Sequence, residues 1–403
     1  MRILYIIPAF QHPNVRGPHR HYHFIRELSK DHDVTLLTLV RSEIPPKAMA
    51  EMSGYVDRIF TFDASMHEHE NGSNGEALPL NWKKLNQLWR EYASVRQMRK
   101  VFTRLAREEH FDVLIFHGKS VFPVIEGWNG LPIVVDFCDA TSMRVRSKME
   151  HASKAKVPLL GLRYTQIRQI ERKLVNKTPH IAFISSRDRE AILGPRDKST
   201  IIPNGMDLNY WQRRTYNPQP NTLIFTGVMN YGPNEDAALY MIDEILPLVK
   251  SAVPDLEVYI VGRDPTPALL ECAQTRPEVK ITGFVEDMRA YMERAMVYAA
   301  PVRIASGMQN KIQEALAMEV PVVTTAVVAE GMKTEDGDEP PLYIAEEPEA
   351  FAAAIIKLLQ QESERERLAK TGRIFTEKHY DWIRSAKQLE QMCFEALKME
   401  VSL

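Results

Sequence analysis

The sequence predicts an α/β protein built from two doubly wound parallel sheets. Short apolar runs alternate with longer segments of helical spacing in both halves of the chain, which is the pattern of strands joined by crossover helices. The runs are apolar at consecutive rather than alternate positions, as strands buried on both faces require. Glycine, proline or a carboxylate follows most of them, so the sheet edges are expected to carry turns.

The expected strands divide into two groups. In the first half they are RILYIIPAF (2–10), VTLLTLV (34–40), RIFTF (58–62), FDVLIFH (111–117), IVVDFC (133–138) and HIAFIS (180–185). In the second half they are TLIFTG (222–227), VYIVG (258–262), VKITG (279–283), VYAAP (297–301) and VPVVTT (320–325). The groups join near IIPNGMDLNYW (201–211), where Pro203, Asn204 and Gly205 interrupt the periodicity.

These breaks predict a first domain over 1–203 and a second over 204–375. The last segment, 376–403, carries a helical apolar stripe that includes Trp382 and Leu389, and we expect it to pack back toward the first domain. The polar stretch HEHENGSNGEALPLN (67–81) is expected to be a surface loop.

Composition favours a cytoplasmic globular protein. Of the 403 residues, 44% are hydrophobic and 26% are charged, which is ordinary for this class. Three separated cysteines, Cys138, Cys272 and Cys393, are too few for a disulfide framework and have no metal-binding spacing. The chain enters a strand at once, with no cleavage region, and no apolar run approaches the roughly 18 residues of a membrane span.

Charge is distributed unevenly. Residues 1–200 carry 31 Lys and Arg against 22 Asp and Glu, a net +9, whereas 201–403 carry 20 against 31, a net −11. Much of the positive excess lies in 144–177. This stretch is either a solvated helix face or a surface for anionic lipid or a phosphate-bearing acceptor. The second alternative would place the protein at the inner face of the membrane; nucleic acid is not expected, since no recognition motif is present.

The segment SGMQNKIQEALAM (306–318) indicates an anion site. Gly307 precedes a helical pattern whose first turns hold Asn310, Lys311 and Glu314. A lysine there adds charge to the positive end of the helix dipole, which suits a phosphate or diphosphate bound by open amides and an ammonium group. The alternative is a lysine extended into water.

The order and spacing of several segments resemble glycosyltransferase family 4, the retaining GT-B enzymes, and most closely its subgroup associated with bacterial exopolysaccharide clusters. The segments are IIPNGMDLNYW, LIFTGVMNYGPNEDAALYMIDEILPLVK, VYIVGRDPTP, ITGFVEDMRAYM and VYAAPVRIASGMQNKIQEALAMEVPVV. The likeness covers about residues 201–335. It implies two Rossmann-like domains facing across a cleft, with the acceptor on 1–203 and a nucleotide-sugar donor on 204–375.

The resemblance also implies roles for single residues. Glu314 matches the glutamate that holds the donor ribose, while Ser306 replaces an acidic residue expected to touch the donor sugar. Val228 and Pro233 stand where relatives place an arginine and a lysine for the diphosphate. Arg303 and Lys311 are therefore the candidates for that positive charge. The remaining expected donor contacts are Gly17, Gly227, Phe284, Val285, Gly307, Met308, Gln309, Asn310 and Glu314.

Some features allow more than one interpretation. Asp139 follows a strand and either orients the acceptor hydroxyl or caps a helix. Cys138 occupies a position where relatives often have histidine. His12, His19, His21 and His23 could bind zinc, contact an acceptor or phosphate, or form a solvated polar face. No metal site is predicted, because no acidic metal motif of other transferases is evident.

We therefore expect a glycosyltransferase that moves a sugar from a nucleotide-diphosphate donor to a hydroxyl of a glycan or lipid-linked acceptor, with retention and without a cofactor. Two alternatives stay open: a catalytically impaired nucleotide-sugar binding protein, because Ser306, Val228 and Cys138 depart from the family pattern, and a GT-B epimerase. The sequence does not indicate the base, the sugar, the acceptor or the oligomeric state.

Overall fold

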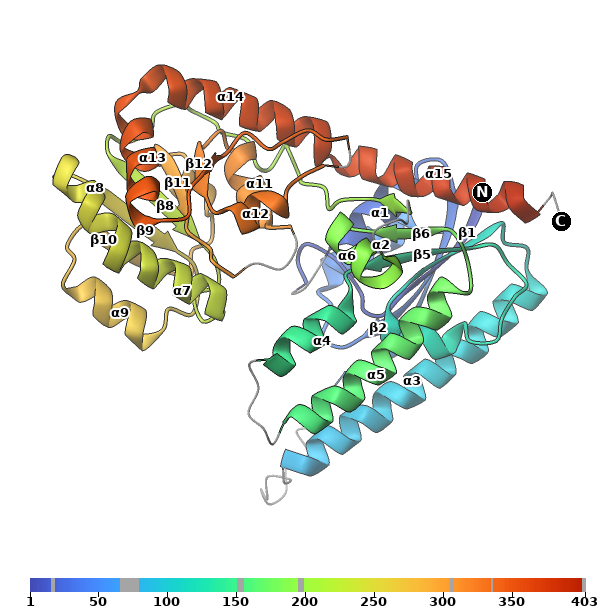
Figure 1. Ribbon diagram of the computed structural model, residues 1–403. Helices are drawn as coiled ribbons and strands as arrows, with labels where there is room; N and C mark the ends of the chain where they lie inside the picture. Colours follow the sequence, from blue (N-terminus) through green and yellow to red (C-terminus); the bar gives the residue numbers. More distant parts are fainter. Residues whose placement is uncertain are drawn as a thin grey trace. The chain divides into compact units, whose positions relative to one another are not determined.

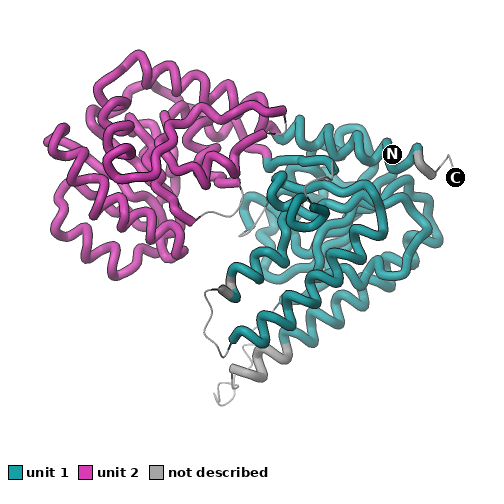
Figure 2. The backbone as a smooth tube through the Cα atoms, viewed as in Figure 1, with its two compact units in different colours: residues 1–204, 382–403 teal, residues 205–381 magenta. Residues whose placement is uncertain are grey.

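The computed structural model describes residues 1–15, 19–65, 80–150, 156–194, 199–304, 308–334 and 336–400. The chain forms two compact units (Figure 2). Unit 1 contains Met1–Asn204 and Trp382–Leu403, and unit 2 contains Gly205–Asp381. Each unit holds one parallel sheet, which confirms the predicted fold class.

The sheet of unit 1 has seven strands in the order β3-β2-β1-β4-β5-β6-β7. All neighbouring strands pair in parallel, as in Ile3 beside Val34 on one side and beside Val113 on the other. The strands are β1 (Arg2–Ile7), β2 (Asp33–Val40), β3 (Arg58–Asp63), β4 (Val113–His117), β5 (Ile133–Cys138), β6 (Ile181–Phe183) and β7 (Thr200–Ile201).

Helices cover both faces of this sheet (Figure 1). Alternate residues of β1 point to opposite faces: Ile3 and Tyr5 pack in one core, and Leu4 and Ile6 in the other. The helices are α1 (Arg20–Leu28), α2 (Pro46–Tyr55), α3 (Leu80–Glu108), η1 (Lys119–Val124), α4 (Thr141–Glu150), α5 (Val157–Val175), α6 (Ser186–Leu193) and α15 (Trp382–Glu400).

The C-terminal helix α15 belongs to unit 1. Trp382, Leu389 and Cys393 are buried in the core that also contains α1 and α2. The preceding helix α14 (Glu362–His379) continues without a break through residue 375 and remains in unit 2. Its Arg373 donates hydrogen bonds to the carbonyls of Trp211 and Ala317, both in unit 2. The chain therefore leaves unit 2 after Asp381, six residues beyond the predicted domain boundary at residue 375.

The sheet of unit 2 has six parallel strands in the order β10-β9-β8-β11-β12-β13. They are β8 (Thr222–Thr226), β9 (Glu257–Val261), β10 (Val279–Gly283), β11 (Val297–Ala300), β12 (Val322–Thr324) and β13 (Tyr343–Ile344). Besides α14, the helices are α7 (Gly232–Tyr240), η2 (Met241–Ile245), α8 (Leu246–Ala252), α9 (Pro267–Gln274), α10 (Arg289–Met292), α11 (Asn310–Ala317), α12 (Ala326–Glu330) and α13 (Pro348–Gln360).

Each sheet reverses its winding direction at one place. In unit 1 the reversal lies between β1 and β4, and in unit 2 it lies between β8 and β11. At such a point the two adjacent loops depart to opposite faces, so a crevice opens at the carboxyl ends of the strands.

Candidate functional site

Two glycines bring the loops of unit 2 close together at the carboxyl ends of β8 and β9. A Cβ atom added to Gly262 would lie 1.7 Å from the carbonyl oxygen of Gly227, and Gly262 has a φ of +152°. A Cβ atom at Gly227 would lie 2.6 Å from Nδ2 of Asn234. The β8 loop is therefore held against the β9 loop by main-chain contact that larger side chains would prevent.

Lys311 connects the elements on the two sides of the winding reversal in unit 2. Its ammonium group donates to Oδ1 of Asn234 at 2.5 Å and lies 4.7 Å from the centre of the Phe225 ring. The Asn234 side chain in turn donates to the carbonyl of Val228 at 3.0 Å. Burial lowers the pKa of Lys311 to about 8 although Glu314 opposes this. The ammonium group thus has a hydrogen-bond partner within unit 2, and Lys311 is partly buried.

Glu314 lies one turn further along α11, on the side of the helix that carries Lys311. Burial raises the pKa of its carboxyl group to about 7, and the attraction of Lys311 only partly offsets this effect. Among the described residues, no side chain or amide donates a hydrogen bond to this carboxylate. A partly buried acid in this state can accept hydrogen bonds from a ligand.

Arg303, predicted to share the diphosphate with Lys311, has another partner in this structure. Its guanidinium group forms an ion pair with Asp236, with Nη2 and Oδ1 2.5 Å apart, and lies 4.3 Å from the centre of the Tyr240 ring. Asp236 and Asn234 are two positions apart on α7, so they point in different directions. The structure therefore does not bring Arg303 and Lys311 to one partner.

Arg263 is a cation that the sequence reasoning missed. It follows β9 after Gly262, and its carbonyl accepts a hydrogen bond from the amide of Met229 in the β8 loop at 3.0 Å. Its side chain is 39% exposed and lies 3.6 Å from Asp264. The signal was present in the turn VGRDPTP, where an arginine follows the glycine at the strand tip.

The other predicted donor contacts lie on the β10 and β11 loops. Phe284 follows β10 and its side chain is 74% exposed, whereas Val285 packs partly against the core of unit 2. Met308 and Gln309 precede α11, and Asn310 is its first residue. The side chain of the N-cap residue Gln309 makes no capping hydrogen bond to the helix. Gly17, Ser306 and Gly307 lie outside the described residues.

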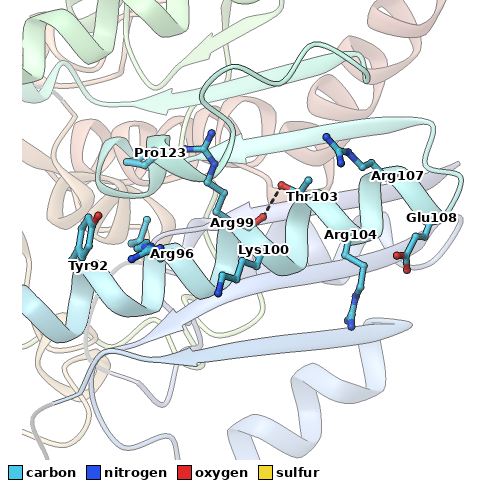
Figure 3. A pocket seen from close by; sticks show the side chains of 10 residues that line it. Tyr92, Arg96, Arg99, Lys100, Thr103, Arg104, Arg107, Glu108 and Pro123 are labelled. Atoms are coloured by element: carbon cyan, nitrogen blue, oxygen red, sulfur yellow. Dashed lines mark hydrogen bonds between the residues drawn. The ribbon is translucent and has the colours of Figure 1, made fainter.

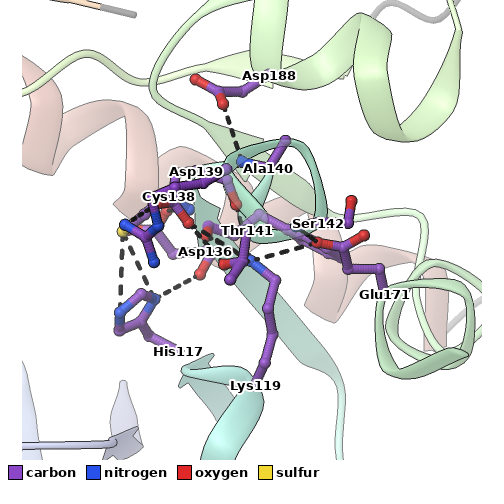
Figure 4. Close-up of polar contacts among 12 residues, drawn as sticks. His117, Lys119, Asp136, Cys138, Asp139, Ala140, Thr141, Ser142, Glu171 and Asp188 are labelled. Carbon is purple, nitrogen blue, oxygen red and sulfur yellow. Dashed lines mark hydrogen bonds and ion pairs between the residues drawn. The ribbon is translucent and has the colours of Figure 1, made fainter. Parts of the chain in front are cut away.

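The carboxyl edge of unit 1 holds a buried polar network (Figure 4). Arg20 and Asp136 form an ion pair at 2.7 Å, and Arg20 also donates to the carbonyl of Pro203. Burial alone would raise the pKa of Asp136, but the charge of Arg20 together with His21 and His117 lowers it well below its usual range. Asp136 is therefore satisfied within the unit and does not act as a free acceptor contact.

Asp139 also has partners of its own. It pairs with Arg144 at 2.7 Å and accepts a hydrogen bond from the Thr141 hydroxyl at 2.8 Å. Lys119 donates to the Asp139 carbonyl at 2.7 Å and to Thr141 at 2.9 Å. The residue thus fixes the start of α4, while its carboxylate, 40% exposed, stays accessible to a ligand.

Three of the four clustered histidines are buried, so the solvated-face interpretation is wrong for them. His12 pairs with Glu51 at 3.1 Å, and His21 bonds to the Tyr5 hydroxyl at 2.8 Å. His23 stacks on Trp382 with ring centres 4.4 Å apart. Only His19 is exposed among the four. Sequence reasoning could not find the cover of His23, because Trp382 of α15 comes from the far end of the sequence.

Cations line a groove on helix α3 (Figure 3). The groove has a volume of about 630 Å³. Its lining residues are Tyr92, Val95, Arg96, Arg99, Lys100, Thr103, Arg104, Arg107, Glu108 and Pro123. The sequence reasoning assigned the basic surface to 144–177 and did not include this helix. No helix in the described part of the chain combines the length and apolar composition that crossing a bilayer requires.

Comparison with known proteins relates the chain to glycosyltransferases. Residues 220–361 match the family described as glycosyl transferases group 1. The phosphatidyl-myo-inositol mannosyltransferase of Mycobacterium leprae is 27% identical over 69% of this chain and 72% of its own length. The enzyme of the same name from Mycolicibacterium smegmatis is 25% identical over 82% of this chain and 83% of its own length.

Solved structures share the fold over nearly the whole chain. Anabaena HepE in complex with UDP superposes with a TM-score of 0.65 at 15% identity, covering 98% of this chain and 100% of that chain. A glycosyltransferase from Rickettsia africae superposes with a TM-score of 0.64 at 12% identity, covering 98% of both chains. The chain therefore has the GT-B fold.

Proposed function

We propose that this protein is a glycosyltransferase that takes a sugar from a nucleotide-diphosphate donor and transfers it, with retention, to a hydroxyl of a glycan or lipid-linked acceptor. The observation that carries the proposal is the Lys311 and Glu314 pair on the first turns of α11. It lies at the winding reversal of unit 2, within the segment that matches the glycosyltransferase family.

Glu314 suits the ribose of a nucleotide diphosphate, and Lys311 suits its diphosphate group. Glu314 is a carboxylate without an internal hydrogen-bond donor among the described residues, so ribose hydroxyl groups can supply the bonds that it lacks. Lys311 would move its ammonium group from Asn234 to the diphosphate, where open amides at the start of α11 also point. Main-chain groups at Phe284 and Val285 would meet the base.

The reaction follows from where negative charge develops. The bond between C1 of the sugar and the diphosphate oxygen breaks, and the acceptor oxygen bonds to C1 on the same face. The acceptor hydroxyl gives its proton to the departing phosphate oxygen. Lys311, with Arg263 as a second cation at the neighbouring strand end, would stabilise the charge on the leaving diphosphate more than the charge of the bound donor.

A panel of nucleotide sugars tests the proposal. The protein is incubated with each donor, with and without an acceptor extract, and released nucleotide and altered sugar are measured. We expect nucleotide release that depends on the acceptor, and a product with the anomeric configuration of the donor. An epimerase would change the sugar without releasing nucleotide, and a binding protein would neither change the sugar nor release nucleotide. Either outcome would refute the transferase assignment.

We also propose that unit 1 contacts anionic membranes. Its basic stretch 144–177 includes α5, on which Leu159 and Leu162 are 71% and 58% exposed beside the exposed Arg163. Trp89 and Tyr92 are similarly exposed on α3 next to the basic groove. Exposed apolar side chains among cations are typical of helices that bind at the surface of anionic lipid. The two named mannosyltransferase relatives, whose names specify phosphatidyl-myo-inositol, are consistent with a lipid-linked acceptor.

Vesicle sedimentation tests this contact. Binding to vesicles with phosphatidylserine should exceed binding to neutral vesicles and should weaken with salt. Replacing Leu159 and Leu162 by serine should reduce binding, whereas Ile374→Ser, at an equally exposed position in unit 2, should not. Equal binding to neutral and anionic vesicles would refute the proposed contact but leave the transferase assignment untouched.

A further inference from the structure

Three side chains that can bind a metal meet at the winding reversal of unit 1. His21 comes from α1, His117 ends β4, and Cys138 ends β5. One ligand atom from each lies within 4.8 Å of the other two. The Cys138 sulfur is 3.9 Å from Nε2 of His21, and it is 3.5 Å from Nδ1 and 4.0 Å from Nε2 of His117. Figure 4 shows Cys138 and His117 facing each other across this edge of the sheet.

The hydrogen bonds of the two histidines indicate which ring nitrogen carries the lone pair that a metal needs. Nδ1 of His117 lies 2.8 Å from the Asp136 carbonyl, which can only accept, so Nδ1 carries the proton and Nε2 the lone pair. Nδ1 of His21 bonds to the Tyr5 hydroxyl, and when Nδ1 donates to that oxygen Nε2 of His21 carries the lone pair as well. Metal-bound histidines in proteins use this arrangement, in which the second nitrogen donates to an oxygen and fixes the ring.

The packing gives Nε2 of His21 no good partner. His21 is completely buried, and its described contacts at Nε2 are the Cys138 sulfur and Oδ2 of Asp136, each at 3.9 Å. A buried ring nitrogen normally has a hydrogen bond at about 3 Å. His117 and Cys138 are only partly buried, so an ion can reach the group from their side.

We propose that Nε2 of His21, Nε2 of His117 and Sγ of Cys138 bind one Zn²⁺ ion. Ideal zinc bonds of about 2.1 Å to nitrogen and 2.3 Å to sulfur, at tetrahedral angles, separate nitrogen from sulfur by about 3.6 Å. The observed 3.9 and 4.0 Å would need to shorten by about 0.4 Å at most. Rotation of the Cys138 and His117 side chains would also have to carry the sulfur from beside Nδ1 to the Nε2 side of the ring. Nitrogen and sulfur donors favour Zn²⁺ over Mg²⁺ or Ca²⁺.

Charge balance indicates what the fourth ligand would be. Zinc displaces the thiol proton of Cys138, and the neighbouring Asp136 and Arg20 cancel each other, so the occupied site carries one net positive charge. A buried net charge is costly. Hydroxide or another anionic oxygen at the open fourth position would neutralise it, and three protein ligands with one open position are typical of reactive zinc sites.

Cobalt substitution tests the site directly. The full-length protein, stripped with a chelator, is titrated with Co²⁺ and then with Zn²⁺. We expect one equivalent per chain, the visible bands of a four-coordinate ion, a thiolate-to-cobalt charge-transfer band, and displacement by Zn²⁺. Mg²⁺ should produce none of these changes.

Variants connect the signal to the three residues. Cys138→Ser should abolish the charge-transfer band and weaken Zn²⁺ binding by about tenfold or more, and His117→Asn should weaken it similarly. Cys272→Ser is the matched control and should retain the full signal. Circular dichroism and thermal unfolding of the metal-free variants show whether they are folded. Binding without a charge-transfer band, or a band that survives in folded Cys138→Ser, would overturn the proposal. Neither result depends on transferase activity.

Discussion

Replacing Glu314 by glutamine should weaken donor binding and stabilise the empty protein at the same time. Burial raises the pKa of Glu314 from 4.5 to about 7, so the folded state holds this proton more tightly than the unfolded state does. Stability should therefore fall as pH rises from about 4.5 to 7 and remain reduced above 7. This rise in pKa corresponds to a loss of roughly 3 kcal/mol in the free energy of unfolding above pH 7.

Glutamine keeps the shape of Glu314 and removes the charge. Part of the gain in stability is offset, because Lys311 then loses its attraction to a carboxylate. We expect the variant to be about 1 to 2 kcal/mol more stable than the natural protein at pH 8. Ribose would lose charge-assisted hydrogen bonds worth roughly 1.5 to 3 kcal/mol, which is about a 10-fold to 150-fold loss in affinity.

Urea unfolding at pH 5 and pH 8 and calorimetric titration with UDP at pH 8 measure both effects. The stability difference should be present at pH 8 and small at pH 5, where the carboxyl group is protonated in the folded state. Glu271→Gln, an exposed position on α9, is the control and should change neither quantity. Unchanged UDP affinity, or a variant less stable than the natural protein at pH 8, would refute the assignment of Glu314. If UDP is not the bound nucleotide, GDP and ADP replace it in the same titration.

Three further changes test the surrounding structure. Lys311→Met should lower turnover by roughly 100-fold while nucleoside affinity barely changes; unaltered turnover would mean that other groups hold the diphosphate. Gly262→Ala should destabilise the protein by more than 3 kcal/mol in urea unfolding, because its Cβ would lie 1.7 Å from a carbonyl oxygen; a loss below 1 kcal/mol would contradict the described main-chain contact. Arg20→Met should cost about 3 to 5 kcal/mol at pH 7 by leaving Asp136 unpaired, and a much smaller loss would show that water reaches that carboxylate.

The fold was predictable because its signal is local. Each apolar run that the sequence analysis identified forms a strand, and the ends differ by a few residues. The missed strands, β7 and β13, have two residues each and lie at sheet edges. Two residues give no periodicity to detect, since their pairing depends on a neighbour distant in sequence.

The candidate site was predictable in part, and the limits have a physical cause. A lysine and a glutamate three positions apart on one helix must share a side, so Lys311 and Glu314 could be paired from spacing. The partner of Arg303 could not be predicted from spacing, because Asp236 comes from another helix. His21, His117 and Cys138 are likewise separated by at least twenty positions along the chain, and only the winding reversal of the sheet brings them together.

The carboxylates of Asp136 and Glu314 differ in a way that separates structure from function. Asp136 is held by Arg20 at 2.7 Å and its pKa falls, so the fold has already supplied the partner that ionisation requires. The pKa of Glu314 rises to about 7, because burial outweighs the single attraction of Lys311. Folding alone gives no reason to retain such a group, since an uncharged side chain of the same shape would cost less. A ligand that donates hydrogen bonds to the carboxylate gives that reason, and a ribose beside a diphosphate would offset the desolvation of both Glu314 and Lys311.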